Sequence, residues 1–327
     1  MLGSESIYNK KEVISEPTDK GMGDGMKLVT FVQNGQYRLG VATAQGVVDV
    51  AAAAAALPEA GQAPSDVHEV IEGGSEAIAS LRRLVDAALS NGSNAAGVLL
   101  PEESLRFGPC VTRPNKIICV GLNYRKHAEE TNAPIPKYPI LFNKFNNTLA
   151  GAGDDIPLPL RVSSAVDYEA ELVIVIGKEA KYVSKENALD HVFGYCNVND
   201  LSARDLQMRT AQWLLGKSLD KFSPLGPYLV TADEVGDPNA LDIRCIVNGE
   251  VRQNSNTSDM IFHCDEIVSY ISQHMTLVPG DIILTGTPEG VVLGLPEEQR
   301  VYLKPGDVVT IEIEKLGSLT NRMVAEA

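Results

Sequence analysis

The sequence predicts an α+β fold rich in β-structure, with a small N-terminal α+β domain followed by a larger β-rich domain. Short runs of β-branched and aliphatic residues recur after residue 116, and Asn-Gly and Pro-Gly turns separate several of them. Helical patterns are fewer and do not alternate with the strands, which argues against a βαβ fold. The expected strands are Ile117–Val120, Leu172–Ile176, Val192–Asn197, Ile243–Val247, Ile282–Leu284 and Val308–Ile313, and the expected helices are Lys185–Asp190, Ala203–Leu214 and Asp265–Met275.

The N-terminal third divides into an extension and a small domain. Residues 1–25 are polar, lack the apolar core of a signal peptide and are expected to be flexible. We place the small domain over residues 26–108 and the larger one over 109–327, because Gly-Pro and Arg-Pro pairs near 108–114 break regular structure. The elements expected in the small domain are strands at 28–32, 37–41 and 47–48, a turn at Asn34-Gly35, and a helix over 66–90 that ends at 91–94.

Composition and charge exclude some classes of partner. The 327-residue chain has 43 acidic and 28 basic residues, and its net charge of −15 argues against nucleic acid and anionic membranes as partners. No segment is long or apolar enough to span a bilayer. A cytoplasmic location is therefore the default expectation. A small anionic substrate would need local cations against this background.

The stretch from Asp167 to Gly177 carries the first chemical signal. Its second half, Leu172–Ile176, is an unbroken apolar run, which predicts a strand buried on both faces. Its first half places Asp167, Glu169 and Glu171 at alternate positions, which share one face of a strand. Carboxylates at this spacing repel one another, and a bound hard cation would replace this repulsion with favourable attraction. The alternative is an exposed strand end with solvated carboxylates.

A third carboxylate, Asp200, follows the predicted strand at 192–198. Its side chain either caps the next helix or joins Glu169 and Glu171. Three carboxylates favour Mg²⁺, Mn²⁺ or Ca²⁺ over Zn²⁺, and they leave positions on an octahedral ion for water or a chelating substrate.

Three further motifs follow predicted strands or lie beside helices. His127 and Glu130 are three residues apart, so they meet on one helical face, where such a pair can orient and deprotonate a water. The alternative is a surface helix start with solvated charges. Lys217 could hold a substrate anion, although exposure is the commoner state of a lysine. The run Leu284–Pro288 could present hydroxyl and N–H groups to a carboxylate, or form only a tight turn.

Together these motifs resemble the fumarylacetoacetate hydrolase (FAH) family, in its acylpyruvase and 2-hydroxyhepta-2,4-diene-1,7-dioate isomerase-like branch. The resemblance covers roughly residues 113–325 and implies a mixed β-sandwich roll that assembles as a homodimer. The motifs that carry it, in order, are G-L-N-Y-x-x-H-x-x-E from residue 121, D-Y-E-x-E-L-x-x-V-I-G from 167, N-D-L-S-A-R-D-x-Q from 199, G-K-S-x-D from 216 and T-G-T-P from 285.

The resemblance implies three groups of site residues and a bound Mg²⁺ or Mn²⁺, with Ca²⁺ as a further option. The implied metal ligands are Glu169, Glu171 and Asp200; the catalytic groups are His127 and Glu130 on a mobile lid, with Lys217; the substrate contacts are Arg204, Gln207 and Thr287.

The reaction implied first is hydrolytic cleavage of a carbon–carbon bond in a 2,4-dioxo acid of the acylpyruvate or fumarylpyruvate type. Glu130 with His127 would deprotonate the attacking water, the metal would stabilise a pyruvate enolate, and Lys217 would help neutralise the oxyanion. Decarboxylation of oxaloacetate and tautomerisation of a hydroxymuconate-type diacid are the alternatives. A non-catalytic binder is the contrasting class, but the chain keeps every ligand and both residues of the dyad.

The chain departs from the family pattern at two places. Relatives commonly have Gly-Val-Gly after the Thr-Pro-x motif, whereas this chain has Gly290-Val291-Val292, with a β-branched residue in place of a glycine. Residues 293–305 also form a longer loop than compact family members carry. Both features are expected to change the shape of the pocket wall, so the family resemblance does not identify the substrate.

Overall fold

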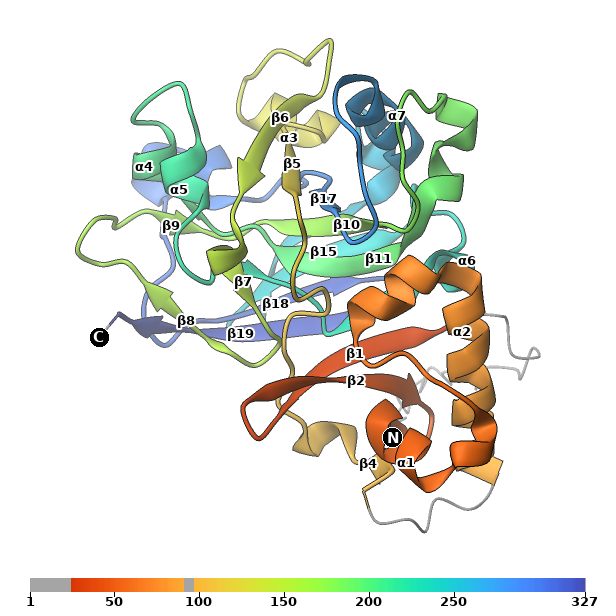
Figure 1. Cartoon of the computed structure of the whole chain (residues 1–327). Helices are drawn as coiled ribbons and strands as arrows, with labels where there is room; N and C mark the ends of the chain where they lie inside the picture. Colours follow the sequence, from red (N-terminus) through yellow and green to blue (C-terminus); the bar gives the residue numbers. More distant parts are fainter. Residues whose placement is uncertain (1–24, 91–96, 327) are drawn as a thin grey trace, which may run out of the picture.

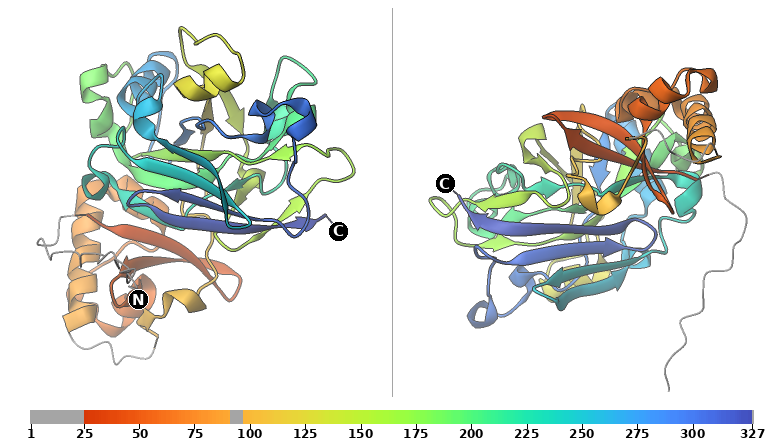
Figure 2. Two further views of the ribbon diagram at one scale, coloured as in Figure 1. Left: turned by 180° about the vertical axis from the view of Figure 1, so that it is seen from behind. Right: turned by 90° about the horizontal axis from the view of Figure 1, so that it is seen from below.

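The computed structural model describes residues 25–90 and 97–326. The predicted flexible extension therefore lies, apart from Gly25, outside the described residues, as does the predicted helix end at 91–94. Two sheets pack against each other in the described part, with the N-terminal helices at one end and short helices around the opposite end (Figures 1 and 2). This β-rich α+β arrangement confirms the predicted fold class.

The larger sheet runs through both predicted domains, because the N-terminal strand β1 pairs antiparallel with β14 of the larger domain. The boundary at residue 108 stays a prediction. In spatial order, the ten strands of this sheet are β4 (Leu99–Leu100), β3 (Gly46–Asp49), β2 (Gln36–Thr43), β1 (Lys27–Gln33), β14 (Tyr228–Thr231), β11 (Val192–Asn199), β10 (Ala170–Ile176), β17 (Ile282–Leu284), β5 (Ile117–Gly121) and β6 (Ile140–Lys144).

The second sheet makes the sandwich. Its order is β16 (Glu250–Asn256), β15 (Asp242–Val247), β18 (Val308–Ile313), β19 (Gly317–Ala325) and β8 (Asp155–Leu158). Most pairings are antiparallel, but β17 with β5 and β19 with β8 are parallel, so the sandwich is mixed. Two short pairs complete the strands: β9 (Val166–Asp167) with β12 (Ser202–Ala203), and β7 (Leu149–Ala150) with β13 (Ser223–Pro224).

Strand β10 lies at the centre and is buried on both faces, as its sequence predicts. Leu172 and Ile174 belong to the core between the two sheets, together with residues of β15 and β18. Val173 and Val175 belong to a second core, which the N-terminal helices cover. The helices of the described chain are α1 (Val50–Ala56), α2 (Val67–Ser90), α3 (Arg125–Glu130), α4 (Arg204–Gln207), α5 (Leu214–Lys217), α6 (Ala232–Val235) and α7 (Cys264–His274).

Local sequence explains several connections. The β1–β2 hairpin turns at Asn34 and Gly35, which both have positive φ (51° and 76°), as a two-residue hairpin turn requires. Asp49 caps α1 by accepting hydrogen bonds from the N–H groups of Ala51 and Ala52.

No helix in the described ranges has the length and apolar character needed to cross a membrane.

Two helix predictions need correction. The expected helix at 203–214 is two short helices, α4 and α5, and residues 208–213 between them are not helical. Thr210 and Gln212 bond to each other through the threonine hydroxyl, a local alternative that competes with helical hydrogen bonds. The segment Lys185–His191 is a 3₁₀-helix, whereas α7 confirms the helix predicted at 265–275.

Candidate functional site

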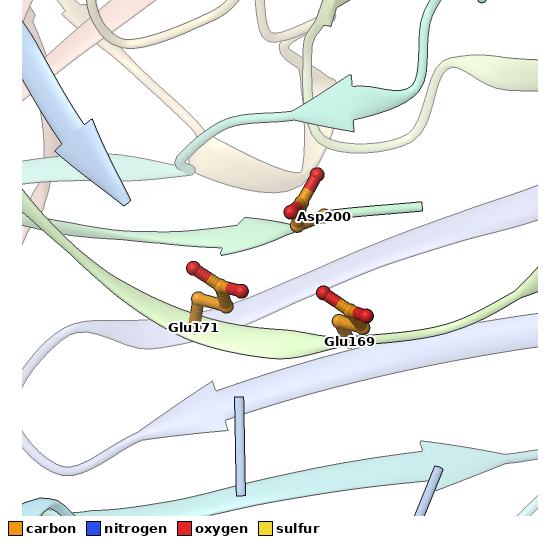
Figure 3. A group of neighbouring side chains, drawn as sticks. All are labelled: Glu169, Glu171 and Asp200. Atoms are coloured by element: carbon orange, nitrogen blue, oxygen red, sulfur yellow. The ribbon is translucent and has the colours of Figure 1, made fainter. Parts of the chain in front are cut away.

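Three carboxylates meet where β10 begins and β11 ends. Antiparallel pairing sets Glu171 opposite Val198, and the N–H of Asp200 donates to the carbonyl oxygen of Glu169 at 2.9 Å. One carboxylate oxygen from each of Glu169, Glu171 and Asp200 lies within 4.8 Å of the other two (Figure 3). The three residues are 4%, 2% and 0% exposed, so they are not solvated at a strand end. We call these three residues the acidic cluster; their role as metal ligands stays a prediction.

Asp167 does not join the acidic cluster, although alternation along a strand predicts that it should. The chain leaves β-structure between β9 and β10, so the alternation does not run through Tyr168 and Glu169. The Asp167 carboxylate accepts hydrogen bonds from the N–H groups of Val292 and Leu293, both at 3.0 Å, and from Nε of Arg204 at 2.9 Å. Asp167 therefore anchors the loop that follows Gly290.

Buried cations pair with two members of the acidic cluster, Glu169 and Asp200. Nζ of Lys217 lies 2.7 Å from Glu169 and 2.6 Å from Asp200, and Nη1 of Arg204 lies 2.7 Å from Glu169. Lys144, which the sequence analysis did not identify, pairs with the other oxygen of Asp200 and also donates to the carbonyl of Phe222 at 2.6 Å.

The alternative that Asp200 caps a helix is wrong, because α4 has Ala203 at its N-cap and no side-chain cap.

The pKa values of two members of the acidic cluster, Glu169 and Glu171, shift in opposite directions. Burial opposes ionisation of Glu169, but Lys217 and Arg204 overcome it and hold the pKa of that carboxyl well below its usual range. Burial raises the pKa of Glu171 well above its usual range, and the charges of Asp200 and Glu169 raise it further. Glu171 has a hydrogen bond from the N–H of Gly286 at 2.8 Å, which offsets this only in part.

The acidic cluster fits a hard divalent cation. Its donors are carboxylate oxygens, the type of ligand that Mg²⁺ and Mn²⁺ prefer. Glu171 sits beside two other carboxylates with no ion pair of its own among the described residues. A buried carboxylate in that position is stabilised as an anion only if positive charge is added nearby.

His127 and Glu130 face the same cavity as Glu169 and Glu171. Nδ1 of His127 lies 2.8 Å from Oε1 of Glu130, and Oε2 accepts a hydrogen bond from the N–H of Gly290 at 3.0 Å. His127 is 8% exposed, so the alternative of a solvated helix start is wrong. Both side chains line a cavity of about 690 Å³, which Glu169 and Glu171 also line.

The predicted substrate contacts also line this cavity. Arg204 bonds to Asp167, Glu169 and Gln207, yet its buried Nη2 has no hydrogen-bond partner. Oγ1 of Thr287 accepts a hydrogen bond from Gln253 at 2.9 Å. The predicted position of Lys217 needs refinement, because its Nζ lies between two carboxylates of the acidic cluster, as well as at the cavity wall.

The two departures from the family pattern have structural consequences. Val292 is buried and does not have a positive φ, so valine causes no backbone strain there, and its N–H bonds to Asp167. Residues of the longer loop, Leu293, Gly294, Leu295, Pro296 and Arg300, line the cavity, so this loop forms part of the pocket wall.

Sequence reasoning missed two groups here. Lys144 is the last residue of β6, a strand that the sequence analysis did not predict, so no sequence pattern pointed to it. Trp213, which packs edge-to-face on Phe142 with 5.2 Å between ring centroids, lay inside the helix that was wrongly predicted.

The comparisons with known proteins settle the family. A model described as fumarylacetoacetate (FAA) hydrolase C-terminal matches residues 116–324. The chain belongs to the fumarylacetoacetate hydrolase family. It is 46% identical over 281 residues to a Bos taurus protein named oxaloacetate tautomerase FAHD2A, mitochondrial, with 85% of this chain and 84% of that protein covered. The membership predicted from the motifs is confirmed, and the chain is an enzyme of this family.

Two solved structures support the same conclusion for the FAH-family fold. The fumarylacetoacetate hydrolase from Exiguobacterium antarcticum is 34% identical, with a TM-score of 0.73 and coverage of 92% of this chain and 100% of the other. The maleylpyruvate hydrolase from Sphingobium sp. SYK-6, solved with manganese(II) and pyruvate, is 30% identical, with a TM-score of 0.72 and the same coverage.

Proposed function

We propose that this chain is a divalent-metal-dependent oxaloacetate tautomerase, which interconverts the keto and enol forms of a small 2-oxo acid. The observation that carries the proposal is that two members of the acidic cluster, Glu169 and Glu171, line one cavity with the His127–Glu130 pair. The oxaloacetate tautomerase that is 46% identical over most of both chains supports this reaction and moves it ahead of the hydrolysis that the motifs alone favoured.

Glu169, Glu171 and Asp200 would hold Mg²⁺ or Mn²⁺, and the manganese complex of the maleylpyruvate hydrolase supports that assignment. A bound divalent cation supplies Lewis-acid chemistry, which stabilises negative charge on the 2-oxo oxygen when the neighbouring carbon loses a proton. The free Nη2 of Arg204 is a buried donor that a substrate carboxylate would satisfy.

Glu130 would move the proton at the carbon next to the oxo group. His127 and the N–H of Gly290 hold its two oxygens, so the carboxylate is oriented before substrate enters. Trp213, Phe142 and Leu295 give the cavity apolar walls, which would limit the water around the proton transfer once substrate fills the cavity.

Hydrolytic carbon–carbon cleavage of a 2,4-dioxo acid is the second candidate. The maleylpyruvate hydrolase supports it, because that protein shares the fold at 30% identity and binds manganese and pyruvate. The same Glu130–His127 pair would then deprotonate a water instead of a carbon acid.

The test measures three reactions of the Mn²⁺-loaded protein. Loss of enol-oxaloacetate absorbance reports tautomerisation, pyruvate released from oxaloacetate reports decarboxylation, and pyruvate released from acetylpyruvate reports hydrolysis. We expect fast tautomerisation with little pyruvate from either substrate. Rapid pyruvate release from acetylpyruvate, without tautomerisation, would replace the first proposal with the second.

A paired variant tests the assignment of the dyad. His127→Asn with Glu130→Gln should lower turnover by about 10²-fold or more, the usual scale for general acid–base groups. Glu129→Gln, an exposed change on the same helix, is the matched control and should leave turnover unchanged. Full activity in the double variant would refute the role of the pair.

A homodimer and a cytoplasmic location stay predictions.

A further inference from the structure

The cavity wall contains an arginine whose charge is not neutralised by any carboxylate in residues 25–90 and 97–326. Arg300 lies on the longer loop, is half-buried and lines the cavity. Its Nε donates to the carbonyl oxygen of Leu295 at 2.9 Å, which closes the loop on itself. No described carboxylate pairs with its guanidinium, so its two terminal amino groups are available to an anion in the cavity.

Each of the other cations of the cavity has a carboxylate partner, and the free Nη2 of Arg204 is assigned above to a substrate carboxylate at the oxo end. Lys217 and Arg204 contact carboxylates of the acidic cluster, and His127 contacts Glu130. An unpaired arginine is notable in a chain with a net charge of −15, where acidic partners are abundant. The planar guanidinium can bind a carboxylate through two parallel hydrogen bonds, which a lysine cannot do.

The loop that carries Arg300 contributes mainly apolar side chains to the cavity wall. Neighbouring wall residues contributed by the loop are Leu293, Leu295 and Pro296, and Trp213 and Phe142 are further apolar walls. A chain of methylene groups would contact these apolar walls, while a terminal carboxylate would need a cation to offset its lost hydration. Arg300 is the cation in the described cavity lining that has no carboxylate partner, so it can meet this need.

We propose that Arg300 determines specificity by binding the distal carboxylate of a 2-oxo dicarboxylic acid. The proposal rests on the proposed function, which directs the 2-oxo end of the substrate to the acidic cluster. Oxaloacetate is itself such a diacid, so the inference adds the residue that recognises the second carboxylate, and it assigns a role to the loop that departs from the family pattern.

The experiment is calorimetric binding of matched ligands to the full-length Mn²⁺-loaded protein. 2-Oxoglutarate is compared with 2-oxovalerate, and 2-oxoadipate with 2-oxohexanoate, so that each pair has equal length and differs only in the second carboxylate. In the unmodified protein, at least one diacid should bind about 10-fold or more tightly than its monoacid.

The variants separate charge recognition from loop structure. Arg300→Gln, whose amide can still donate to Leu295, should reduce the diacid-to-monoacid ratio to about one and change monoacid affinity less than about 3-fold. Arg300→Lys should restore part of the ratio. Arg209→Met removes an exposed positive charge from the nearby 208–213 segment and should leave the ratio unchanged.

The proposal is overturned if neither diacid is preferred, if Arg300→Gln keeps the preference, or if it weakens both members of a pair equally. These outcomes are distinguishable from failure of the proposed reaction. Diacid preference that depends on Arg300, in a protein without tautomerase activity, would support the inference and reject the reaction. Tautomerase activity without that preference would support the proposed reaction and reject the inference about Arg300.

Discussion

Asp167→Asn is the substitution whose effect the structure predicts most directly. The carboxylate is fully buried and accepts four hydrogen bonds, from the N–H groups of Tyr168, Val292 and Leu293 and from Nε of Arg204, at 2.9–3.0 Å. Asparagine has nearly the same shape but only one acceptor oxygen. Its NH₂ group must therefore face two of the four donors, whichever way the amide is turned.

The magnitude follows from the bonds that are lost. A hydrogen bond to a charged group contributes about 1.5–3 kcal/mol to the free energy of unfolding. In the asparagine variant two of the four such bonds are lost, because the NH₂ group faces two N–H donors. Arg204 keeps its contact with Glu169, which limits the cost of the missing charge. We expect the free energy of unfolding of the metal-free protein to fall by about 3–6 kcal/mol.

Urea unfolding followed by circular dichroism measures this change, with free energies compared near the midpoints of the transitions. The control is Asp205→Asn, because Asp205 is exposed; it accepts hydrogen bonds from Oγ of Ser163 and from the N–H groups of Leu206 and, at 3.3 Å, Ser164. It should cost less than about 1 kcal/mol. If Asp167→Asn also costs less than that, the four contacts do not anchor the loop, and the explanation of why Asp167 is no ligand fails.

Three other predictions concern pH and a close contact. The raised pKa of Glu171 favours its protonated form in the metal-free protein, so Mn²⁺ binding should release a proton and should weaken as pH falls. Calorimetry in buffers of different ionisation enthalpy measures the proton release, and calorimetry at several pH values measures the affinity. Gly294→Ala places a Cβ 2.5 Å from Cδ of Glu130 and should lower turnover by about 10-fold or more without changing Mn²⁺ affinity. Burial and the charge of Arg113 lower the pKa of His68, whose Nε2 accepts from the Arg113 N–H. Protonation therefore favours the unfolded chain, and stability should fall as pH drops below about 6.5, less steeply in His68→Gln, measured by urea midpoints.

Each of these predictions has an outcome that would contradict it. Calorimetric enthalpies that do not depend on the buffer at neutral pH would mean that Glu171 is already ionised. Unchanged turnover in Gly294→Ala would mean that the loop moves without disturbing the dyad. Identical pH profiles for the parent protein and His68→Gln would remove His68 from the account of stability.

The sequence alone determined several central strands and most of the ionisable residues that line the candidate site. An unbroken β-branched run such as Leu172–Ile176 can bury both faces only inside a sheet, and its neighbours in the structure confirm this. The ordered motifs predicted the family, because each places a chemically unusual residue at a strand or helix end. Lys217 and the His127–Glu130 pair line the cavity as these motifs indicated.

Only the tertiary structure decided which carboxylates face one another. Asp167 has the same spacing as Glu169 and Glu171, but the chain leaves the strand between them, and donors from residues 292 and 293 capture Asp167 instead. Lys144 and Arg300 likewise reach the site from distant segments, and no local pattern encodes such contacts. Periodicity reports which face of an element a side chain occupies, whereas its partner across the fold depends on long-range packing that the sequence pattern does not contain.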